Sequence, residues 1–218
     1  MLRDNWADTT SSGRGPQDSL RANMRDTRII VLASASPRRK EILAKTGLKF
    51  KVDESAYEER IVAGLKPESL AAFLSRGKAR DVARRYRNAL VIAADTIVVS
   101  KGRLFGKPRT GEEAREMLNS LSGKSHFVIT GFTIIDTASK RELSRSVKSK
   151  VFFKRLSRDE IEAYIRSGEP LDKAGAYGIQ GLGAVLIKKI DGDFFNVVGL
   201  PLNALSESLK KFGIKALS

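Results

Sequence analysis

The sequence contains no cysteine in its 218 residues and only a single histidine, His126. Without thiolates the chain can form neither a disulfide nor a cysteine-ligated metal site. This fits a reducing compartment, and we expect a cytoplasmic protein. A zinc site needs several histidine or cysteine ligands, so none is expected at His126. No apolar run approaches the roughly 20 residues that span a membrane, and we therefore expect a soluble chain with no membrane partner.

Acidic residues are outnumbered, because 40 Lys and Arg face 25 Asp and Glu and give a formal net charge of +15. Such an excess favours polyanionic partners, namely nucleotides, nucleic acid or a membrane surface. The basic residues are scattered along the chain rather than gathered in one tract, which argues against nucleic acid. Hydrophobic residues make up 41% of the chain, an ordinary share for a globular protein, and the length suits one α/β domain or two small lobes.

Residues 1–27 are rich in Ser, Thr, Gly, Asp and Arg and show no apolar periodicity. Such a composition predicts a disordered N-terminal tail. The segment has no hydrophobic signal region, and its four aspartates argue against an acid-poor transit peptide. Residues 28–218 would then form the folded domain.

The first informative stretch, Ile29–Leu43, reads IIVLASASPRRKEIL. Its short apolar run predicts a buried strand, and Ser36 and Pro37 suit the cap and first position of a helix ending near Gly47. The basic residues 38–40 in the first helical turn are repelled by the positive end of the helix dipole, and a bound anion would offset that repulsion. Free N–H groups, hydroxyls and guanidinium groups together suit a phosphate. An ordinary strand–turn–helix with solvated basic residues explains the pattern equally well.

The second stretch, Ala89–Val99, is aliphatic almost throughout, as a strand buried on both faces should be. Asp95 and Thr96 interrupt it. A buried charge is costly unless it is paired or binds a cation, and burial would also suit an aspartate to acid–base chemistry. A structural aspartate is the alternative, but we favour function because the small residues Ala93 and Ala94 leave room for a ligand.

The third stretch, Leu171–Gly183, reads LDKAGAYGIQGLG. Its four glycines would let the backbone approach a ligand closely, although a flexible loop has the same composition. It does not match the dinucleotide-binding fingerprint. The polar side chains between the glycines are Asp172, Lys173, Tyr177 and Gln180. The segment that follows, Ala184–Pro201, predicts a β-hairpin with Gly192 at its turn.

Further elements are predicted from apolar runs, turn residues and helix-capping pairs. A hairpin turn is expected at Lys101-Gly102, and capping boxes at Thr110/Glu113 and Ser157/Glu160 would begin two helices. We expect strands at 50–52, 127–135 and 147–153, and helices at 67–82, 110–121, 157–168 and 202–212.

Several charged residues outside these stretches are candidates for phosphate or metal binding. Glu58 and Glu59 lie in an acidic loop that is solvated or, near a triphosphate, could hold Mg²⁺. Lys78 lies on the long helix that begins at Pro67, and Lys107 lies in a Gly-Lys-Pro turn. On local grounds Lys78 is read as a surface lysine, whereas Lys107 could reach a phosphate, although the Gly-Lys-Pro tripeptide alone is nonspecific.

Six motifs occur in a fixed order, namely SASPRR, AADT, GKP, LSGKSH, DKAGAYGIQG and DGDFFNVVGLP. Together they resemble the Maf family of nucleotide pyrophosphatases from residue 28 to the C-terminus. The resemblance implies an α/β fold with a long mixed β-sheet flanked by helices, two lobes and a central cleft, as in the inosine triphosphatases. It also implies a homodimer and hydrolysis of nucleoside triphosphates to monophosphate and pyrophosphate with a divalent cation, Mg²⁺ or Mn²⁺.

Within the family, Arg38, Thr96 and Gln180 match the branch that acts on dTTP and UTP, with modified pyrimidine triphosphates as further candidate substrates. The resemblance makes Asp95 the catalytic residue, either as general base or as a ligand of the activating metal. Thr96 and Gln180 would hydrogen-bond the pyrimidine edge.

The residues implied in triphosphate binding are all polar or basic: Ser34, Arg38, Lys78 and Lys107. The metal ligands are unknown from the sequence, with Glu58 and Glu59 as candidates. A non-catalytic alternative remains, a nucleotide- or nucleic-acid-binding regulator of cell division, as the historical name of the family suggests. Asp95 together with the basic set favours an enzyme.

Overall fold

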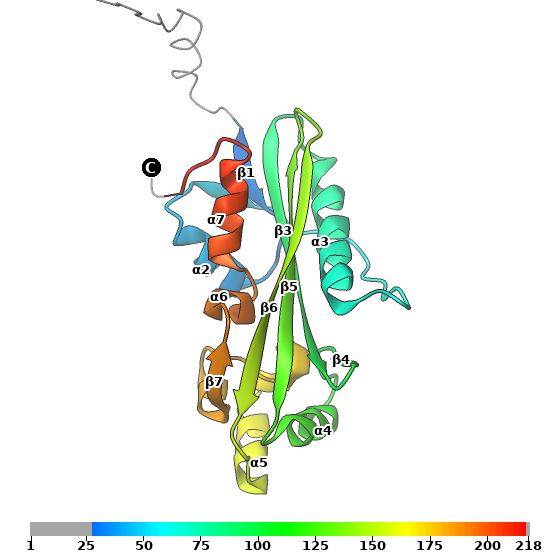
Figure 1. Cartoon of the computed structure of the whole chain (residues 1–218), viewed down its shortest axis with the longest axis vertical. Coiled ribbons are helices and arrows are strands. Elements are labelled where there is room, and N and C mark those ends of the chain that lie inside the picture. Colours follow the sequence, from blue (N-terminus) through cyan, green and yellow to red (C-terminus); the bar gives the residue numbers. More distant parts are fainter. Residues whose placement is uncertain (1–27, 217–218) are drawn as a thin grey trace, which may run out of the picture.

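The computed structural model describes residues 28–216, so the tail predicted at 1–27 lies outside the described residues. Its centre is a seven-stranded mixed sheet with the order β2-β1-β3-β5-β6-β7, in which β4 also pairs with β3 (Figure 1). The predicted long mixed sheet flanked by helices is confirmed. The strands are β1 (Ile29–Leu32), β2 (Phe50–Val52), β3 (Ala89–Ser100), β4 (Arg103–Phe105), β5 (Ser125–Asp136), β6 (Glu142–Phe153) and β7 (Ile187–Asp191).

Helices cover both faces of the sheet and its lower end (Figure 1). No helix within residues 28–216 is both long enough and apolar enough to span a membrane. The α-helices are α2 (Pro37–Ala44), α3 (Pro67–Ala83), α4 (Gly111–Leu121), α5 (Arg158–Arg166), α6 (Phe194–Val198) and α7 (Leu202–Lys210). The 3-10 turns are η1 (Glu169–Asp172), η2 (Ala174–Ala176) and η3 (Leu182–Leu186).

One edge of β3 is shared by two short strands that leave a gap between them. β1 pairs in parallel with Ala89–Ile92, whereas β4 pairs antiparallel with Val98–Ser100. No strand within residues 28–216 pairs with this edge of β3 between Ile92 and Val98. The gap therefore separates an upper part of the molecule from a lower part and leaves the middle of this edge of β3 without a strand partner.

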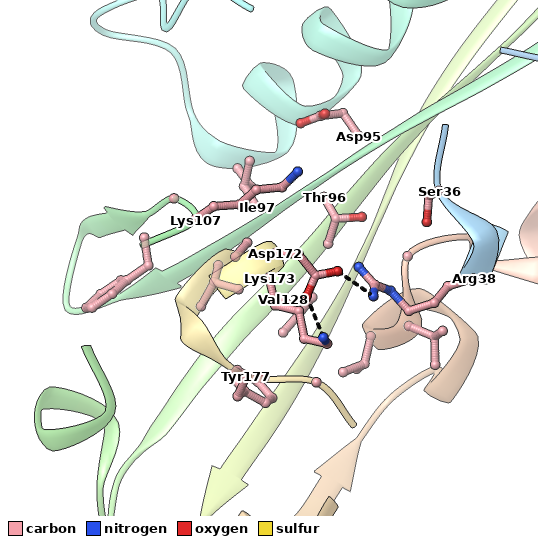
Figure 2. Close-up of a pocket in the computed structure, with 18 of the residues that line it drawn as sticks. Ser36, Arg38, Asp95, Thr96, Ile97, Lys107, Val128, Asp172, Lys173 and Tyr177 are labelled. Carbon is pink, nitrogen blue, oxygen red and sulfur yellow. Dashed lines mark hydrogen bonds and ion pairs between the residues drawn. The ribbon is translucent and has the colours of Figure 1, made fainter. Parts of the chain in front are cut away.

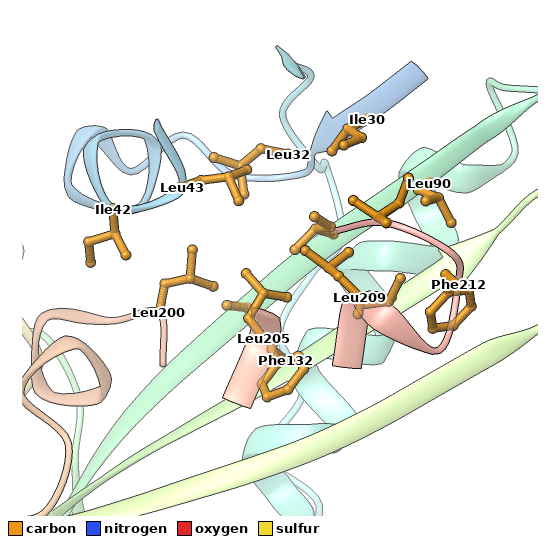
Figure 3. Close-up of a cluster of buried hydrophobic side chains, with 14 of the residues drawn as sticks. Ile30, Leu32, Ile42, Leu43, Leu90, Phe132, Leu200, Leu205, Leu209 and Phe212 are labelled. Carbon is orange, nitrogen blue, oxygen red and sulfur yellow. The ribbon is translucent and has the colours of Figure 1, made fainter. Parts of the chain in front are cut away.

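Each part has its own hydrophobic core. In the upper part, α2 and α7 pack on one sheet face around Leu32, Leu90 and Phe132 (Figure 3). In the lower part, α4, α5 and the 3-10 turns enclose a second cluster around Leu118 and Val151. Because successive strand residues point to opposite faces, the intervening residues of β1 and β3 pack instead against α3.

Helix α3 lies unusually close to the sheet at Gly131. A Cβ atom on Gly131 would lie 2.2 Å from the carbonyl oxygen of Ala71, so only glycine permits this approach. Gly131 pairs in register with Asp95 on β3. The close approach therefore brings α3 directly over Asp95.

The predicted starts of helices and the first hairpin turn are confirmed. Ser36 caps α2 by accepting a hydrogen bond from Arg39 N, with Pro37 as the first helical residue. Ser157 and Glu160 form a complete capping box. At α4 only the Thr110 half is formed, because the Glu113 carboxylate accepts instead from the backbone N–H of the preceding Arg109. Lys101 and Gly102 both have positive φ, as a tight hairpin turn requires.

The predicted hairpin at Ala184–Pro201 is wrong in its second half. β7 forms, but the residues after Gly192 make the short helix α6 rather than a returning strand. Asp193 caps this helix by accepting from Asn196 N at 3.2 Å. The Asn196 side chain is completely buried and bonds to Thr130 N, Val128 O and Ser149 Oγ. These bonds to β5 and β6 hold α6 against the sheet in place of a strand.

Several boundaries also differ from the predictions. The first helix ends at Ala44 and the chain then turns through Gly47, which has φ +75°. β6 begins at Glu142 rather than near residue 147, and β5 is likewise longer at both ends. The first half of β6 is polar and carries no apolar alternation, so its strand character comes from pairing with β5.

His126 belongs to the lower core. It is 1% exposed, its ring packs edge-on against Phe153 and Tyr177, and its Nε2 lies 2.7 Å from the Tyr177 hydroxyl oxygen. Burial lowers the pKa of His126 to about 4. The ring is therefore neutral near pH 7 and serves as a packed polar residue.

Candidate active site

A cavity of about 430 Å³ opens where the edge of β3 is left unpaired (Figure 2). This volume lies within the usual range for small-molecule sites. Its walls come from the start of α2, one face of α3, the middle of β3, the turn after β4, the η1–η2 segment and the end of α6. Seven of the residues predicted for the site or its metal line it: Arg38, Glu59, Lys78, Asp95, Thr96, Lys107 and Gln180.

Two carboxylates and one ammonium group meet on the α3 side of the cavity. Lys78 Nζ lies 2.5 Å from Asp95 Oδ1 and 2.6 Å from Glu59 Oε1. Lys78 is placed here because α3 packs tightly at Gly131, one strand away from Asp95. Glu59 reaches the same point from the loop before α3. The cluster joins residues from three separate segments of the chain.

Two opposing electrostatic effects act on the pKa of the Asp95 carboxyl group in this cluster. Burial raises the pKa of Asp95, while the positive charges of Lys78 and Arg39 oppose the rise. For Glu59, partial burial raises the pKa, but the hydrogen bond and charge of Lys78, followed by the charges of Lys107 and Arg39, bring it below its usual value. Asp95 is thus the carboxyl group better able to take up a proton at this site.

Thr96 points to the opposite face of β3 from Asp95, as the strand pleat requires (Figure 2). Its hydroxyl accepts a hydrogen bond from Arg39 Nη2 at 3.0 Å and lies 2.9 Å from the Thr130 hydroxyl. Arg39 also donates from Nε to the carbonyl oxygen of Gly199 at 2.8 Å. Burial lowers the pKa of Arg39. This network fixes a guanidinium group in the cavity wall.

Further basic groups line the mouth of the cavity. Arg38 Nη1 lies 3.2 Å from Asp172 Oδ2, and Lys173 Nζ lies 2.5 Å from Asp172 Oδ1 (Figure 2). The Arg38–Asp172 pair links α2 of the upper part to η1 of the lower part. Lys107 projects from the turn that follows β4. Together these residues place three cationic groups and one carboxylate around the cavity.

Two predicted residues do not line the cavity. Ser34 lies behind Arg39, where its hydroxyl accepts hydrogen bonds from Arg39 Nη1 at 3.5 Å and from Ser36 N at 3.2 Å. Its direct contact with a phosphate stays a prediction. Glu58 is exposed outside the cavity, whereas the neighbouring Glu59 lines it.

A divalent cation is compatible with this donor set. Within residues 28–216 no group of three or more His, Asp and Glu side chains is placed to hold a metal ion. However, Mg²⁺ in nucleotide enzymes commonly takes one or two protein carboxylates and completes its shell with substrate phosphates and water. Asp95 and Glu59, which contact the same ammonium group, fit that pattern.

Among the charged residues that line the cavity, the predicted site set omitted Arg39, Asp172 and Lys173. Arg39 follows Arg38 in the first turn of α2, and a helix turns about 100° per residue, so the two side chains point in different directions. No local signal in the sequence separated Arg39 from Arg38, because the partner that holds Arg39, the Gly199 carbonyl oxygen, lies 160 positions away. Asp172 was noted as a polar residue of the glycine-rich stretch, but its pairing with Arg38 spans 134 positions of sequence.

Comparisons with known proteins identify the family of this chain. Residues 29–212 match the family model described as Maf-like protein. The chain is 52% identical over 188 residues to a dTTP/UTP pyrophosphatase of Methanococcoides burtonii, which covers 86% of this chain and 96% of the relative. Relatives of the same name from Methanosarcina barkeri and Moorella thermoacetica are 50% and 48% identical, covering 86% and 85% of this chain and 95% of each relative. This chain belongs to the Maf family.

Proposed function

We propose that this protein hydrolyses dTTP and UTP to the nucleoside monophosphate and pyrophosphate, with modified pyrimidine triphosphates as further substrates. The observation that carries the proposal is the Asp95–Lys78–Glu59 cluster in a cavity whose mouth is lined by cations. Relatives about half identical over most of the chain bear the name dTTP/UTP pyrophosphatase, which supports this choice of substrate.

The reaction breaks the bond between the α- and β-phosphoryl groups and adds water across it. Arg38, Arg39 and Lys107 bind the triphosphate and offset its negative charge. Asp95 in its ionised form accepts the proton of the attacking water. Lys78 holds the Asp95 carboxylate in place and stabilises its charged form. Charge that develops on the leaving pyrophosphate is stabilised by the same cations.

Asp95 and Glu59 would hold a divalent cation, Mg²⁺ or Mn²⁺, together with the phosphates of the substrate. When bound, such an ion acts as a Lewis acid on phosphoryl oxygen and lowers the pKa of coordinated water. The two carboxylates share one ammonium group, so an added cation would offset the further negative charge that a bound triphosphate brings to the site. A homodimer in the cytoplasm is part of the proposal.

Base selectivity is assigned to Gln180, which lines the cavity from the glycine-rich stretch. Its side-chain amide both donates and accepts hydrogen bonds, as the pyrimidine edge requires. We expect Gln180→Ala to lower the ratio of kcat/KM for UTP over GTP by about tenfold or more, since a site built for such bonds rejects bases that cannot make them. Steady-state pyrophosphate release with both nucleotides measures the ratio, and an unchanged ratio would show that Gln180 does not read the base.

The function is tested by pyrophosphate release from a panel of nucleoside triphosphates, with Mg²⁺ or Mn²⁺ and with EDTA. We expect release that favours dTTP and UTP and stops on chelation. Release from purine or methylated triphosphates alone would overturn the assigned substrate, and release that persists in EDTA would overturn the metal. No release from any nucleotide would overturn the enzyme.

A further inference from the structure

The segment Gly178–Gly183 carries Gln180 at its exposed tip and lines the cavity beside it. The Gln180 amide makes no hydrogen bond of its own within residues 28–216, so its position depends on the backbone that bears it. The first end of the segment is held by Tyr164 of α5. The Tyr164 hydroxyl oxygen accepts a hydrogen bond from Gly178 N at 3.1 Å.

The second end of the segment is held by Glu169, the first residue of η1. Its two carboxylate oxygens accept hydrogen bonds from Leu182 N at 2.8 Å and from Gly183 N at 3.1 Å. The two anchors are also joined to each other, because the Tyr164 hydroxyl donates to Glu169 Oε1 at 3.0 Å. One side-chain pair, the buried Tyr164 and the half-buried Glu169, therefore ties both ends of the segment.

Close backbone contacts show how tightly the segment is drawn together. A Cβ atom on Gly183 would lie 2.3 Å from the carbonyl oxygen of Gly178 and 2.5 Å from the Tyr164 hydroxyl oxygen. A Cβ atom on Gly181, which has φ +87°, would lie 2.8 Å from Glu169 Oε2. The glycines that the sequence places here thus let the two ends meet on the Tyr164–Glu169 pair.

The pair itself does not belong to the cavity wall. Neither Tyr164 nor Glu169 lines the cavity, and Tyr164 is 5% exposed. Burial raises the pKa of Tyr164, so its hydroxyl keeps its proton and remains a donor at neutral pH. The hydrogen bonds of the Tyr164 hydroxyl and the Glu169 carboxylate run to the segment that carries Gln180, and through this segment they reach the cavity.

We propose that Tyr164 and Glu169 are positioning residues for base selection, which fix Gln180 against the pyrimidine edge. The inference rests on the proposed function and deepens it. The cluster around Asp95 lies on different elements, so hydrolysis itself does not depend on the pair. Loosening the segment is expected to weaken recognition of the base and to spare the chemical step.

The variants Glu169→Gln and Tyr164→Phe test this division. The glutamine amide keeps the shape of Glu169 but can no longer accept from both Leu182 N and Gly183 N, and phenylalanine removes the hydroxyl that joins the two anchors. For each variant we expect KM for UTP to rise and the UTP/GTP ratio of kcat/KM to fall by about tenfold, while kcat for UTP stays within about threefold of wild type.

Glu162→Gln is the matched control. Glu162 lies on the same helix as Tyr164 and pairs with Arg115 of α4, away from the glycine-rich segment. It is expected to leave the UTP/GTP ratio unchanged. If Glu162→Gln changes the ratio as much as Glu169→Gln, the effect is a general loosening of the lower part and the proposal fails.

A double-mutant cycle with Gln180→Ala completes the test. Once Gln180 is removed, Glu169→Gln should lower the ratio no further. Additive losses would overturn the claim that Glu169 acts through Gln180. If the wild-type protein does not hydrolyse dTTP or UTP, the proposed function is overturned instead. Wild-type discrimination that survives in both Glu169→Gln and Tyr164→Phe would overturn only the positioning role.

Discussion

Asp95→Asn is expected to lower kcat for UTP hydrolysis by about 10²- to 10⁴-fold, the usual contribution of a positioned base. The asparagine keeps the shape of the side chain and can still bond to Lys78, so the fold should persist. What it loses is the negative charge that accepts a proton or binds a cation. Initial rates of pyrophosphate release, with circular dichroism as the check on folding, measure the effect.

Asp136→Asn provides the matched control for this substitution. Asp136 lies on the same sheet and is 6% exposed, as Asp95 is, but it pairs with Arg28 outside the cavity. It should lose stability and keep kcat. A folded Asp95→Asn protein with wild-type turnover would remove Asp95 from the mechanism.

Lys78→Met is expected to lower kcat/KM for UTP by about 10²- to 10³-fold, comparable to the loss of one preorganised donor at a reacting centre. Methionine keeps much of the length of the lysine stem but leaves Asp95 and Glu59 without their shared cation. The charge of Lys78 lowers the pKa of Asp95 against the effect of burial. Its removal therefore raises that pKa further.

The change in the pKa of Asp95 also predicts the direction in which the pH profile of the Lys78→Met variant shifts. The base works only when ionised, so a higher pKa of Asp95 moves the acidic limb of kcat/KM to higher pH. Lys148→Met is the control, because Lys148 pairs with Glu68 outside the cavity. An acidic limb that stays in place in Lys78→Met would contradict the electrostatic coupling between Lys78 and Asp95.

Much of the fold could be predicted because local signals agreed with tertiary structure. Ser36-Pro37 and the Ser157/Glu160 pair begin helices by satisfying free backbone N–H groups, and such caps depend on nearby residues alone. The aliphatic run of β3 marked a strand buried on both faces, and Asp95 stood out against it. These features lie within short windows of sequence.

The errors arose where distant partners decide the structure. The residues after Gly192 have the apolar composition of a strand, but Asp193 caps the helix α6 there. From α6, the Asn196 side chain makes hydrogen bonds to Thr130 N of β5 and Ser149 Oγ of β6. The sequence carried one signal for this helix, because Asp193 stands three residues before Asn196, whose backbone N–H it caps. The polar half of β6 is likewise a strand only because β5 pairs with it.

In the candidate site, too, tertiary packing decides between residues that look alike in the sequence. Glu58 and Glu59 are equivalent in the sequence, yet only Glu59 reaches Lys78, because the loop is anchored by Tyr57 against Gly77 of α3. The Ser34 hydroxyl accepts a hydrogen bond from Arg39, and its contact with a phosphate stays a prediction. Residue type and spacing identified the chemistry, whereas the assignment between neighbours required the packing of α3 on the sheet.

Our central prediction is that a pyrimidine triphosphate bound in the cavity beside β3 is hydrolysed between its α- and β-phosphoryl groups. Product analysis of UTP incubated with Mg²⁺ and the full-length protein tests it most directly. We predict UMP and pyrophosphate in equal amounts from the wild type and almost none from Asp95→Asn. Formation of UDP and orthophosphate, or equal product from the two proteins, would contradict the account.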